Sequence, residues 1–329
     1  MHILVIGAAG MIGRKLVKAI IAKGHIGGRP VDRLTLADII EPEASSNFRG
    51  KAETIASDLT EEGAAAKLVS AAPDLIFHLA AIVSGEAEAD FEKGYRVNLD
   101  GTRSLFEAIR RKGLESPYAP KVVFTSSIVV YGEPLPEVIE DTYFLAPLTS
   151  YGTQKAIGEL LLADYSRRGF FDGIGIRLPT ISIRPGKPNN AASGFFSSIL
   201  REPLIGMEAV LPVSDAVRHW FASPRAAINF LMHAAEIDTA PLGSRRSLTM
   251  PGLAATVGEE IEALRRMAGE KAVKLIRREP NPAVASIIAG WPQSFDAKRA
   301  ASLGFVAEKT FDEIIRVHIE DELENALPA

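Results

Sequence analysis

The chain has 329 residues, of which 47% are hydrophobic and 24% are charged, enough for a large α/β unit with an elaborated C-terminal part. Its 41 acidic and 37 basic residues give a net charge of -4 without a basic stripe, which argues against nucleic acid as a partner. The absence of cysteine excludes disulfides and thiolate chemistry, and the six histidines do not fall at metal-ligand spacing.

The N-terminus and the apolar stretches give no sign of export or of a membrane span. Residues 1–6 run straight into a glycine turn and lack the charged region and cleavage site of a signal peptide. The longest apolar stretch, residues 75–83, contains His78 and is far shorter than the roughly 18 to 20 residues of a membrane helix. We therefore expect a metal-free cytoplasmic protein that binds neither membranes nor nucleic acid.

Strand and helix patterns alternate through the first half of the chain. Residues 3–6 are typical of a buried strand, and after a glycine turn apolar residues recur at helical spacing as far as Gly24. This alternation predicts an α/β fold with a doubly wound parallel Rossmann sheet, which binds ligands at the carboxyl ends of its strands. Further strands are expected over residues 34–39, 74–79 and 121–125, with helices over 63–70 and 98–112.

From about Gly173 onward, prolines divide the chain into shorter elements. Helices are expected over residues 229–236, 257–268 and 310–322. We interpret this part as a smaller C-terminal substrate-binding lobe. The predicted domains are a cofactor-binding Rossmann domain over residues 1–175 and, over 176–329, mainly this lobe, with some segments returning to the Rossmann core.

A glycine-rich turn joins the first strand to the first helix. Glycines let the backbone turn tightly and approach a pyrophosphate, while the helix N-terminus offers free N–H groups and a partial positive charge. A glycine pattern alone can equally be a structural turn, but its place directly after an apolar strand favours dinucleotide binding. The expected cofactor contacts in this turn are Gly7, Gly10, Met11, Ile12 and Gly13.

The end of the second strand bears on the choice of cofactor. Asp38 stands there, where a carboxylate would accept hydrogen bonds from the adenosine ribose and repel the 2′-phosphate of NADP. NAD is therefore the expected cofactor, with NADP as the alternative because Arg14 and Arg33 could support a phosphate. Asp58 and Leu59 follow a short β-like stretch and could contact the edge of the adenine ring of the cofactor, although Asp58 could equally cap a helix.

Tyr151 and Lys155 lie four positions apart at the start of an expected helix that a preceding hydroxyl residue could cap. This spacing puts the phenol and the ammonium on one helix face. A nearby cation favours ionised tyrosine and lowers its pKa towards the range of a general base. Such a pair alone usually lies on the protein surface. The strand that ends in Ser126 and Ser127, however, would reach the same ligand-binding crevice at the carboxyl ends of the strands as this helix.

Together these motifs resemble the extended short-chain dehydrogenase/reductase superfamily, also known for its NAD-dependent epimerases and dehydratases. The resemblance spans essentially the whole chain. Beyond the glycine turn and the Tyr151/Lys155 pair, it rests on Asp58–Leu59, residues 78–81, Asn98 with Gly101 and Thr102, the strand through Ser127 to Tyr131 and Gly132, and residues 295–305.

The resemblance implies a division of labour among the matching residues. Tyr151 is the implied acid/base, Lys155 holds the nicotinamide ribose and tunes Tyr151, and Ser127 bonds the reacting oxygen with Ser126 as its substitute. It also implies a homodimer. Further implied NAD contacts are Asp58, Leu59, Leu79, Ala80, Ala81 and Asn98, the last of which could instead be a local helix cap.

The sequence also limits which reaction of the superfamily this chain can catalyse. Superfamily members that dehydrate nucleotide sugars carry an Asp-Glu pair where this chain has Ile128 and Val129, so elimination would lack its proton carriers. Residues 79–86, 177–186 and 218–224 resemble the branch of D-erythronate dehydrogenases, which oxidise the C2 hydroxyl of a four-carbon sugar acid with NAD. A nucleotide-sugar 4-epimerase with tightly bound NAD is the alternative, and a non-enzymatic NAD-sensing regulator is a third hypothesis.

A small polyhydroxy acid as substrate needs a cation for its carboxylate and hydroxyl partners for specificity. Arginines are the obvious cations, although each could also be plain surface charge. Trp220 is expected in the core rather than as a substrate platform. The candidate substrate contacts are Ser84, Ser126, Ser127, Arg184, Asn190 and Arg218.

Overall fold

A computed structural model describes residues 1–44, 46–186 and 193–325. The chain divides into two compact units, each assembled from three stretches of sequence. The functional division expected between residues 1–175 and 176–329 concerns what each part binds and stays a prediction. Unit 1 comprises Met1–Val130, Thr149–Arg177 and Ile228–Leu248, and unit 2 comprises Tyr131–Leu148, Leu178–Ala227 and Thr249–Ala329.

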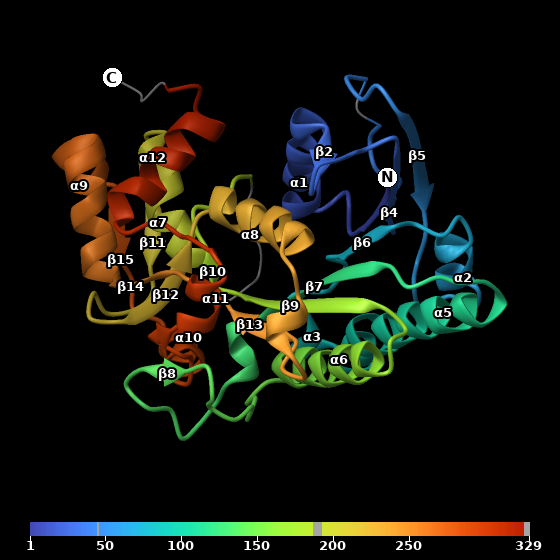
Figure 1. Cartoon of the computed structure of the whole chain (residues 1–329). Coiled ribbons are helices and arrows are strands. Elements are labelled where there is room, and N and C mark those ends of the chain that lie inside the picture. The colour runs from blue at the N-terminus through green and yellow to red at the C-terminus, as the bar shows by residue number, and fades with distance from the viewer. Residues whose placement is uncertain (45, 187–192, 326–329) are drawn as a thin grey trace. The chain divides into compact units, whose positions relative to one another are not determined.

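The central sheet of unit 1 has seven strands in the order β13-β9-β7-β6-β1-β4-β5 (Figure 1). Parallel pairing joins β1 to β4 and β6, β4 to β5, and β6 to β7, which confirms the predicted doubly wound parallel sheet. Its strands are β1 (His2–Ile6), β4 (Arg33–Asp38), β5 (Lys51–Ala56), β6 (Leu75–His78), β7 (Lys121–Ser127), β9 (Asp172–Leu178) and β13 (Ser247–Thr249).

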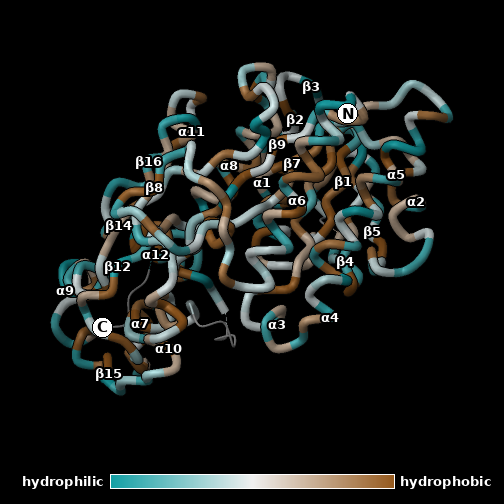
Figure 2. The backbone as a smooth tube through the Cα atoms, turned by 90° about the horizontal axis from the view of Figure 1, so that it is seen from below, coloured by the Kyte–Doolittle hydropathy of each residue, from teal (hydrophilic) through white to brown (hydrophobic). Residues whose placement is uncertain are grey.

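Apolar strands and helices build the core of unit 1. Ile3, Leu4 and Val5 of β1 are fully buried, as expected of a strand covered on both faces, and the backbone along β1 is hydrophobic in Figure 2. Leu105 and Phe106 of α5 pack into the same core. The helices are α1 (Met11–Lys23), α2 (Ala64–Val69), α3 (Ser84–Ala89), α4 (Phe91–Gly94), α5 (Gly101–Glu115) and α6 (Ser150–Arg167), with a π-helix η1 over Tyr95–Asp100.

Unit 2 contains smaller sheets and its own core, in which Phe196, Ile199, Phe221, Leu264 and Ile314 are buried. A three-stranded sheet has the order β10-β12-β14, and two pairs join β11 to β15 and β16 to β8. The strands are β8 (Ile139–Glu140), β10 (Thr180–Ile181), β11 (Ala209–Leu211), β12 (Arg218–Ala222), β14 (Leu253–Thr256), β15 (Ile276–Arg278) and β16 (Phe295–Asp296). The helices are α7 (Gly194–Leu204), α9 (Val257–Val273, with non-helical backbone at Gly269), α10 (Pro282–Ala289), α11 (Lys298–Ser302) and α12 (Phe311–Glu322).

Helix α8 (Pro224–Glu236) continues from unit 2 into unit 1 and begins earlier than predicted. The hydroxyl of Ser223 accepts the N–H of Ala226 at 3.0 Å, and proline is favourable at the first helical position. Trp220 is 7% exposed, which confirms its predicted place in a core. The remaining elements are β2 (His25–Ile26), β3 (Arg29–Pro30) and the 3-10 turns η2 (Ile128–Val130) and η3 (Ala240–Leu242).

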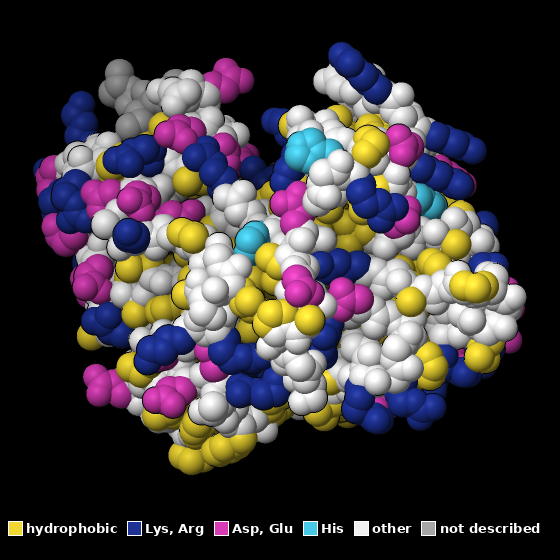
Figure 3. Space-filling model, in the orientation of Figure 1, with side chains coloured by type: hydrophobic (Ala, Val, Ile, Leu, Met, Phe, Trp, Pro, Cys, Tyr) yellow, Lys and Arg dark blue, Asp and Glu magenta, His cyan; other side chains and the backbone are white. Residues whose placement is uncertain are grey.

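Acidic and basic side chains are interspersed on the face drawn in Figure 3. Several form ion pairs, such as Arg33 with Glu53 at 2.8 Å and Arg225 with Glu320 at 2.8 Å. None of the helices in the described residues is long and apolar enough to cross a membrane.

Candidate active site

The glycine turn follows β1 and is packed too closely for side chains at two positions. Gly7 has φ 92°, and a Cβ there would lie 2.7 Å from the backbone nitrogen of Ala80, just beyond β6. A Cβ on Gly13 would lie 2.1 Å from the carbonyl oxygen of Gly7. These two glycines let the turn pack against the β6 end and let α1 pack on the turn. Gly10 is exposed, and a Cβ there would meet nothing closer than 3.4 Å.

Asp38 ends β4 beside this turn. Its Oδ2 accepts the N–H of Ala9 at 2.9 Å, and its Oδ1 accepts the N–H of Ile39 at 2.8 Å. The two arginines that could have supported the phosphate of NADP both have partners within unit 1. Arg14 donates to the carbonyl of Ala9, and Arg33 pairs with Glu53. This arrangement agrees with the expectation of NAD.

A cavity of about 1020 Å³ opens beside the turn. Its lining includes Ala9, Arg14, Ile40 and the acidic Glu41 and Glu43. The sequence did not point to the segment after Asp38, because only the folded chain shows that Ile39 and Ile40 are exposed there. The cavity is large enough for the adenosine part of a dinucleotide.

Asp58 and Leu59 follow β5. The Oδ1 of Asp58 accepts the N–H of Thr60 at 2.8 Å, a local turn contact. The following helix α2 has Gly63 as its N-cap, so Asp58 is not the helix cap of the alternative interpretation. Leu59 is 8% exposed and belongs to the core of unit 1. The structure therefore gives Asp58 a local role, and a role towards adenine stays a prediction.

The segment after β6 is held in place by buried groups. Leu79 and Ala80 donate their N–H groups to the carbonyl of Ile6 at 2.8 and 3.0 Å, so these donors are used inside the unit. Ala81 is partly buried in the same segment. The buried Asn98 accepts the N–H of Ile82 at 2.9 Å.

Asn98 is not the local helix cap of the alternative interpretation. It lies within the π-helix η1, and its Nδ2 donates to the carbonyl of Ile82 at 3.2 Å and to Oε1 of Gln154 at 2.8 Å. Because Gln154 lies on α6 beside Lys155, Asn98 ties the segment after β6 to the helix that carries the predicted catalytic pair. π-helical turns are frequent at functional sites.

Helix α6 starts as expected, with the hydroxyl of Thr149 accepting the N–H of Gly152 at 3.0 Å. Lys155 is 3% exposed, and its Nζ donates to the carbonyl of Thr125 at 2.8 Å. The same Nζ lies 5.7 Å from the ring centroid of Tyr151. This contact ties α6 to the end of β7, where Ser127 is half-buried and its Oγ accepts the N–H of Val129 at 3.4 Å.

The pKa values of the pair differ from the sequence expectation. Burial raises the pKa of Tyr151 to about 12, so the predicted lowering by Lys155 is wrong for this structure. The reason is that desolvation disfavours the phenolate while the ammonium bonds to Thr125. Burial also lowers the pKa of Lys155 to about 8, and the Glu159 carboxylate acts in the opposite direction. At neutral pH the phenol is protonated and the lysine is mostly charged.

Sequence reasoning missed a buried carboxylate next to these groups. Glu159 accepts a hydrogen bond from the hydroxyl of Ser126 and is held by the guanidinium of Arg177 through two nitrogens. In the sequence, Arg177 is only the first residue of the segment 177–186, which resembles the branch of D-erythronate dehydrogenases. The available signal was the spacing of Glu159, one helical turn beyond Lys155.

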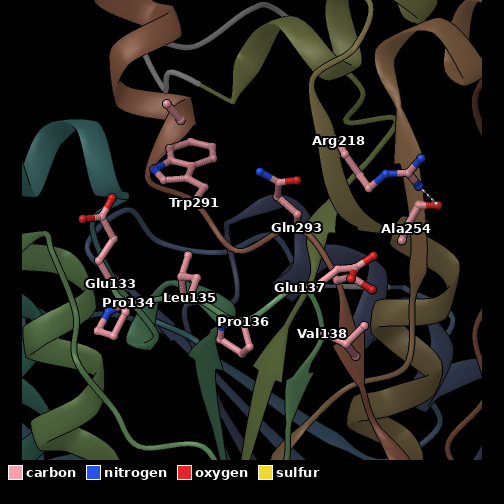
Figure 4. Close-up of a pocket in the computed structure, with 12 residues that line it drawn as sticks. Glu133, Pro134, Leu135, Pro136, Glu137, Val138, Arg218, Ala254, Trp291 and Gln293 are labelled. Carbon is pink, nitrogen blue, oxygen red and sulfur yellow. Dashed lines mark hydrogen bonds between the residues drawn. The ribbon is translucent and has the colours of Figure 1, made fainter.

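Two of the candidate substrate contacts lie in unit 2. Arg218 on β12 is 41% exposed, and its Nη1 lies 3.8 Å from Glu259 and 3.5 Å from the carbonyl of Ala254 (Figure 4). It lines a cavity of about 980 Å³ whose walls include Glu137, Trp291 and Gln293, none of which the sequence pointed to.

Arg184 is tied to the start of α7. Its Nη2 donates to the hydroxyl of Ser193 at 2.7 Å, and its N–H donates to the hydroxyl of Ser197 at 3.1 Å. Burial and the neighbouring Arg201 lower the pKa of Arg184.

Ser84 is the first residue of α3 in unit 1 and is partly buried, and Ser126 is buried. Asn190 lies outside the described residues. Within the described ranges, no group of three or more His, Asp or Glu side chains could hold a metal ion.

Comparison with known proteins identifies the family. The model of the NAD dependent epimerase/dehydratase family matches residues 3–227. A D-erythronate dehydrogenase from Cupriavidus necator is 46% identical over 325 residues, which cover 98% of each chain. A D-erythronate dehydrogenase from Haemophilus influenzae is 39% identical over 325 residues, covering 98% of this chain and 100% of that one.

Solved structures agree with the family. A structure named nucleoside-diphosphate-sugar epimerase from Agrobacterium tumefaciens shares 65% identity, with a TM-score of 0.98 and coverage of 100% of this chain and 96% of that one. An L-threonine dehydrogenase from Cupriavidus necator, at 22% identity and a TM-score of 0.80 over 98% of this chain and 99% of its own, shares the fold. The resemblance to the extended short-chain dehydrogenase/reductase superfamily is confirmed: the chain belongs to the NAD dependent epimerase/dehydratase family and is an NAD-dependent oxidoreductase.

Proposed function

We propose that the protein oxidises the C2 hydroxyl of D-erythronate to 2-dehydro-D-erythronate, with Tyr151 as the general base. The observation that carries the proposal is the hydrogen bond from Lys155 to Thr125, which ties the Tyr151 helix to the strand ending in Ser127. The similarity to two D-erythronate dehydrogenases over nearly the full chain supports the substrate.

The residues at the strand ends suit the cofactor. NAD supplies the hydride acceptor when it is bound. Gly7 and Gly13 have no room for a Cβ against the protein's own backbone, which keeps the turn tight, and the exposed Gly10 leaves the backbone open to a pyrophosphate. Asp38 at the end of β4 can bind the adenosine ribose. The full set of proposed NAD contacts is Gly7, Gly10, Met11, Ile12, Gly13, Asp38, Asp58, Leu59, Leu79, Ala80, Ala81, Asn98, Tyr151 and Lys155.

In the proposed reaction, the Tyr151 phenolate takes the proton of the C2 hydroxyl, and the alcohol becomes a ketone because bound NAD would supply the acceptor for the C2 hydride. The hydroxyl of Ser127 bonds the reacting oxygen. The charged Lys155 binds the nicotinamide ribose, and its charge favours the phenolate against the larger, opposite effect of burial. Because the pKa of Tyr151 is about 12, the base form is a minority at neutral pH.

The remaining assignments concern the substrate and the assembly. We propose that residues 1–175 bind NAD and that residues 176–329 mainly bind the sugar acid. Arg218, half-exposed in its cavity, suits the substrate carboxylate better than Arg184, whose guanidinium is held by Ser193. We also propose that the protein works in the cytoplasm as a homodimer.

The test mixes the purified protein with NAD and D-erythronate and follows the absorbance of reduced cofactor. NADP, related sugar acids of four to six carbons and Tyr151→Phe serve as controls. We expect rapid reduction of NAD that Tyr151→Phe lowers by about 10²-fold or more, since the general base is lost. Silence with every sugar acid would contradict the proposal.

A second candidate is a nucleotide-sugar 4-epimerase, favoured by the name of the 65% identical structure from Agrobacterium tumefaciens. It would use the same Tyr151, Lys155 and Ser127, with Arg184 and Arg218 on the diphosphate. This activity would interconvert UDP-sugars without net accumulation of reduced NAD. A regulator that only senses NAD would bind NAD and show neither activity, and Tyr151→Phe would then be silent.

A further inference from the structure

A buried ion pair lies behind the predicted catalytic residues of unit 1. Glu159 on α6 is 4% exposed and Arg177 on β9 is 8% exposed. The Arg177 Nη2 donates to Oε2 of Glu159 at 2.6 Å, and its Nε donates to Oε1 at 2.9 Å. Desolvation makes buried pairs costly, and apolar residues of similar volume often replace them without loss of stability. The other contacts of the pair therefore indicate what it does besides stabilising the fold.

The first such contact is with Ser126. This serine is 3% exposed, and its hydroxyl donates to Oε1 of Glu159. A hydrogen bond to a carboxylate is shorter and stronger than one between neutral groups. Since successive strand residues point to opposite faces, fixing Ser126 on one face also fixes how Ser127 is presented on the other. The carboxylate thus holds the end of β7.

The second contact is electrostatic. Tyr151, Lys155 and Glu159 follow one another at four-residue steps along α6, which brings them to one side of the helix. Burial lowers the pKa of Lys155 to about 8, and the Glu159 carboxylate acts against this lowering. Lys155 in turn donates to Thr125, the residue before Ser126. Both side chains of α6 therefore hold the same strand end.

We propose that Glu159, held by Arg177, is a positioning residue for the proposed oxidation: it fixes the Ser126–Ser127 end of β7 and keeps a negative charge one helical turn from Lys155. This inference rests on the proposed roles of Tyr151, Lys155 and Ser127. A merely structural ion pair would stabilise unit 1 without affecting the ionisation of Lys155 or the rate of the reaction.

The first test measures the Lys155 pKa by NMR on the full chain with carbon-13 in its lysine side chains, using Lys155→Met to assign the signal. We expect Glu159→Gln to lower this pKa by about one unit, because burial then acts without the opposing carboxylate. Arg177→Lys keeps the charge of the pair and should leave the Lys155 pKa close to that of the unmodified protein.

Glu107→Gln is the matched control. Glu107 on α5 binds Arg110 through two nitrogens at 2.8 and 2.6 Å, the same geometry in a more exposed place. We expect it to leave the Lys155 pKa unchanged. If Glu159→Gln does not fold because Arg177 is left buried and unpaired, the double change Glu159→Met with Arg177→Met removes both charges. The double variant should also lower the Lys155 pKa, but by less than Glu159→Gln, because the positive charge of Arg177 is removed as well.

The second test follows turnover. Glu159→Gln should lower kcat about tenfold with little change in the KM for NAD, and Ser126→Ala should lower kcat while leaving the Lys155 pKa unchanged. An unchanged Lys155 pKa and unchanged kcat in Glu159→Gln or in the double variant would overturn the inference. The NMR measurement needs no substrate, so it stays decisive even if D-erythronate proves not to be one.

Discussion

Glu159 on a helix of unit 1 and Glu260 on a helix of unit 2 are both buried, but their carboxyl groups have opposite surroundings. Glu159 in unit 1 has Ser126 and Arg177 as partners, whereas Glu260 in unit 2 is 0% exposed and neither of its carboxyl oxygens has a hydrogen-bond partner among the described residues. Burial therefore raises the pKa of Glu260 well above its ordinary value. Partners, not residue type, decide whether a buried carboxyl is charged.

The same contrast holds for the predicted site residues. In unit 1, Lys155, Asn98 and Ser126 are buried and bound by short hydrogen bonds, which suits groups that must keep one geometry during a reaction. In unit 2, Arg218 is 41% exposed and its nearest polar contacts lie at 3.5 and 3.8 Å. A side chain with such loose contacts can turn towards an anionic ligand.

The largest effect is expected from Gly13→Ala in unit 1. The added Cβ would lie 2.1 Å from the Gly7 carbonyl oxygen, so the turn must move, and we expect a destabilisation of about 3 kcal/mol. NAD binding, measured by calorimetry, should be lost. Gly10→Ala is the control for stability alone, because Gly10 is itself a proposed NAD contact: its Cβ has room within the protein, so the free energy of unfolding should change by less than about 1 kcal/mol. Normal NAD affinity in Gly13→Ala would contradict the proposed pyrophosphate site.

The pH dependence of oxidation tests the proposed roles of Tyr151 and Lys155 in unit 1. Because burial raises the Tyr151 pKa to about 12, the phenolate fraction grows as pH rises, and kcat/KM should increase up to about tenfold per unit between pH 6 and 8. Above about pH 8 the rise should flatten as Lys155 loses its proton. His78, with a pKa of about 3, stays neutral throughout.

Steady-state rates in overlapping buffers give this profile, and Glu159→Gln should move the flattening to lower pH. A rate that falls from pH 6 to 8 would contradict Tyr151 as the base.

Local patterns explain why so much of unit 1 could be predicted. The buried strand β1, the turn at Gly7 and the Thr149 cap of α6 each depend on residues that are neighbours in sequence. Asp38 and Ser127 lie at strand ends as predicted. Their place in one crevice, expected because parallel strands end at one edge of a sheet, stays a prediction.

What the sequence could not provide depends on contacts between distant residues. Glu159 and Arg177 meet across α6 and β9, and Asn98 meets Gln154, through pairings that no local spacing indicates. The Tyr151 pKa was predicted in the wrong direction because burial is a property of the folded chain. The sequence could not indicate Trp291 for the same reason, because only folding brings it into the unit 2 cavity that Arg218 also lines.

Arg218→Ala tests whether the loosely held cation of unit 2 binds substrate. A charge-assisted contact to a carboxylate contributes about 1.5 to 3 kcal/mol, so the KM for the sugar acid should rise about 10- to 100-fold. The KM for NAD should not change. Arg277→Ala is the control, since Arg277 is exposed in the same unit and pairs with Glu279 at 2.9 Å. Equal KM values for the sugar acid in the two variants would contradict a role of Arg218 in substrate binding.

The smallest effect is expected from Glu260→Gln, measured by urea unfolding at pH 5 and pH 8. The folded-state pKa of Glu260 is raised, so its contribution to stability is complete below the unfolded pKa and is lost as pH rises through the folded value. A glutamine cannot ionise, and the variant should therefore have a higher free energy of unfolding than the natural chain at pH 8, with a smaller difference at pH 5.

Glu262→Gln, on the same helix but exposed and paired with Arg265, should show no such gain. A loss of stability at pH 8 in Glu260→Gln would mean that the natural carboxyl is charged and stabilised in the folded protein. Glu159 and Glu260 would then be alike, and the contrast between the units would have to rest on Arg218 alone.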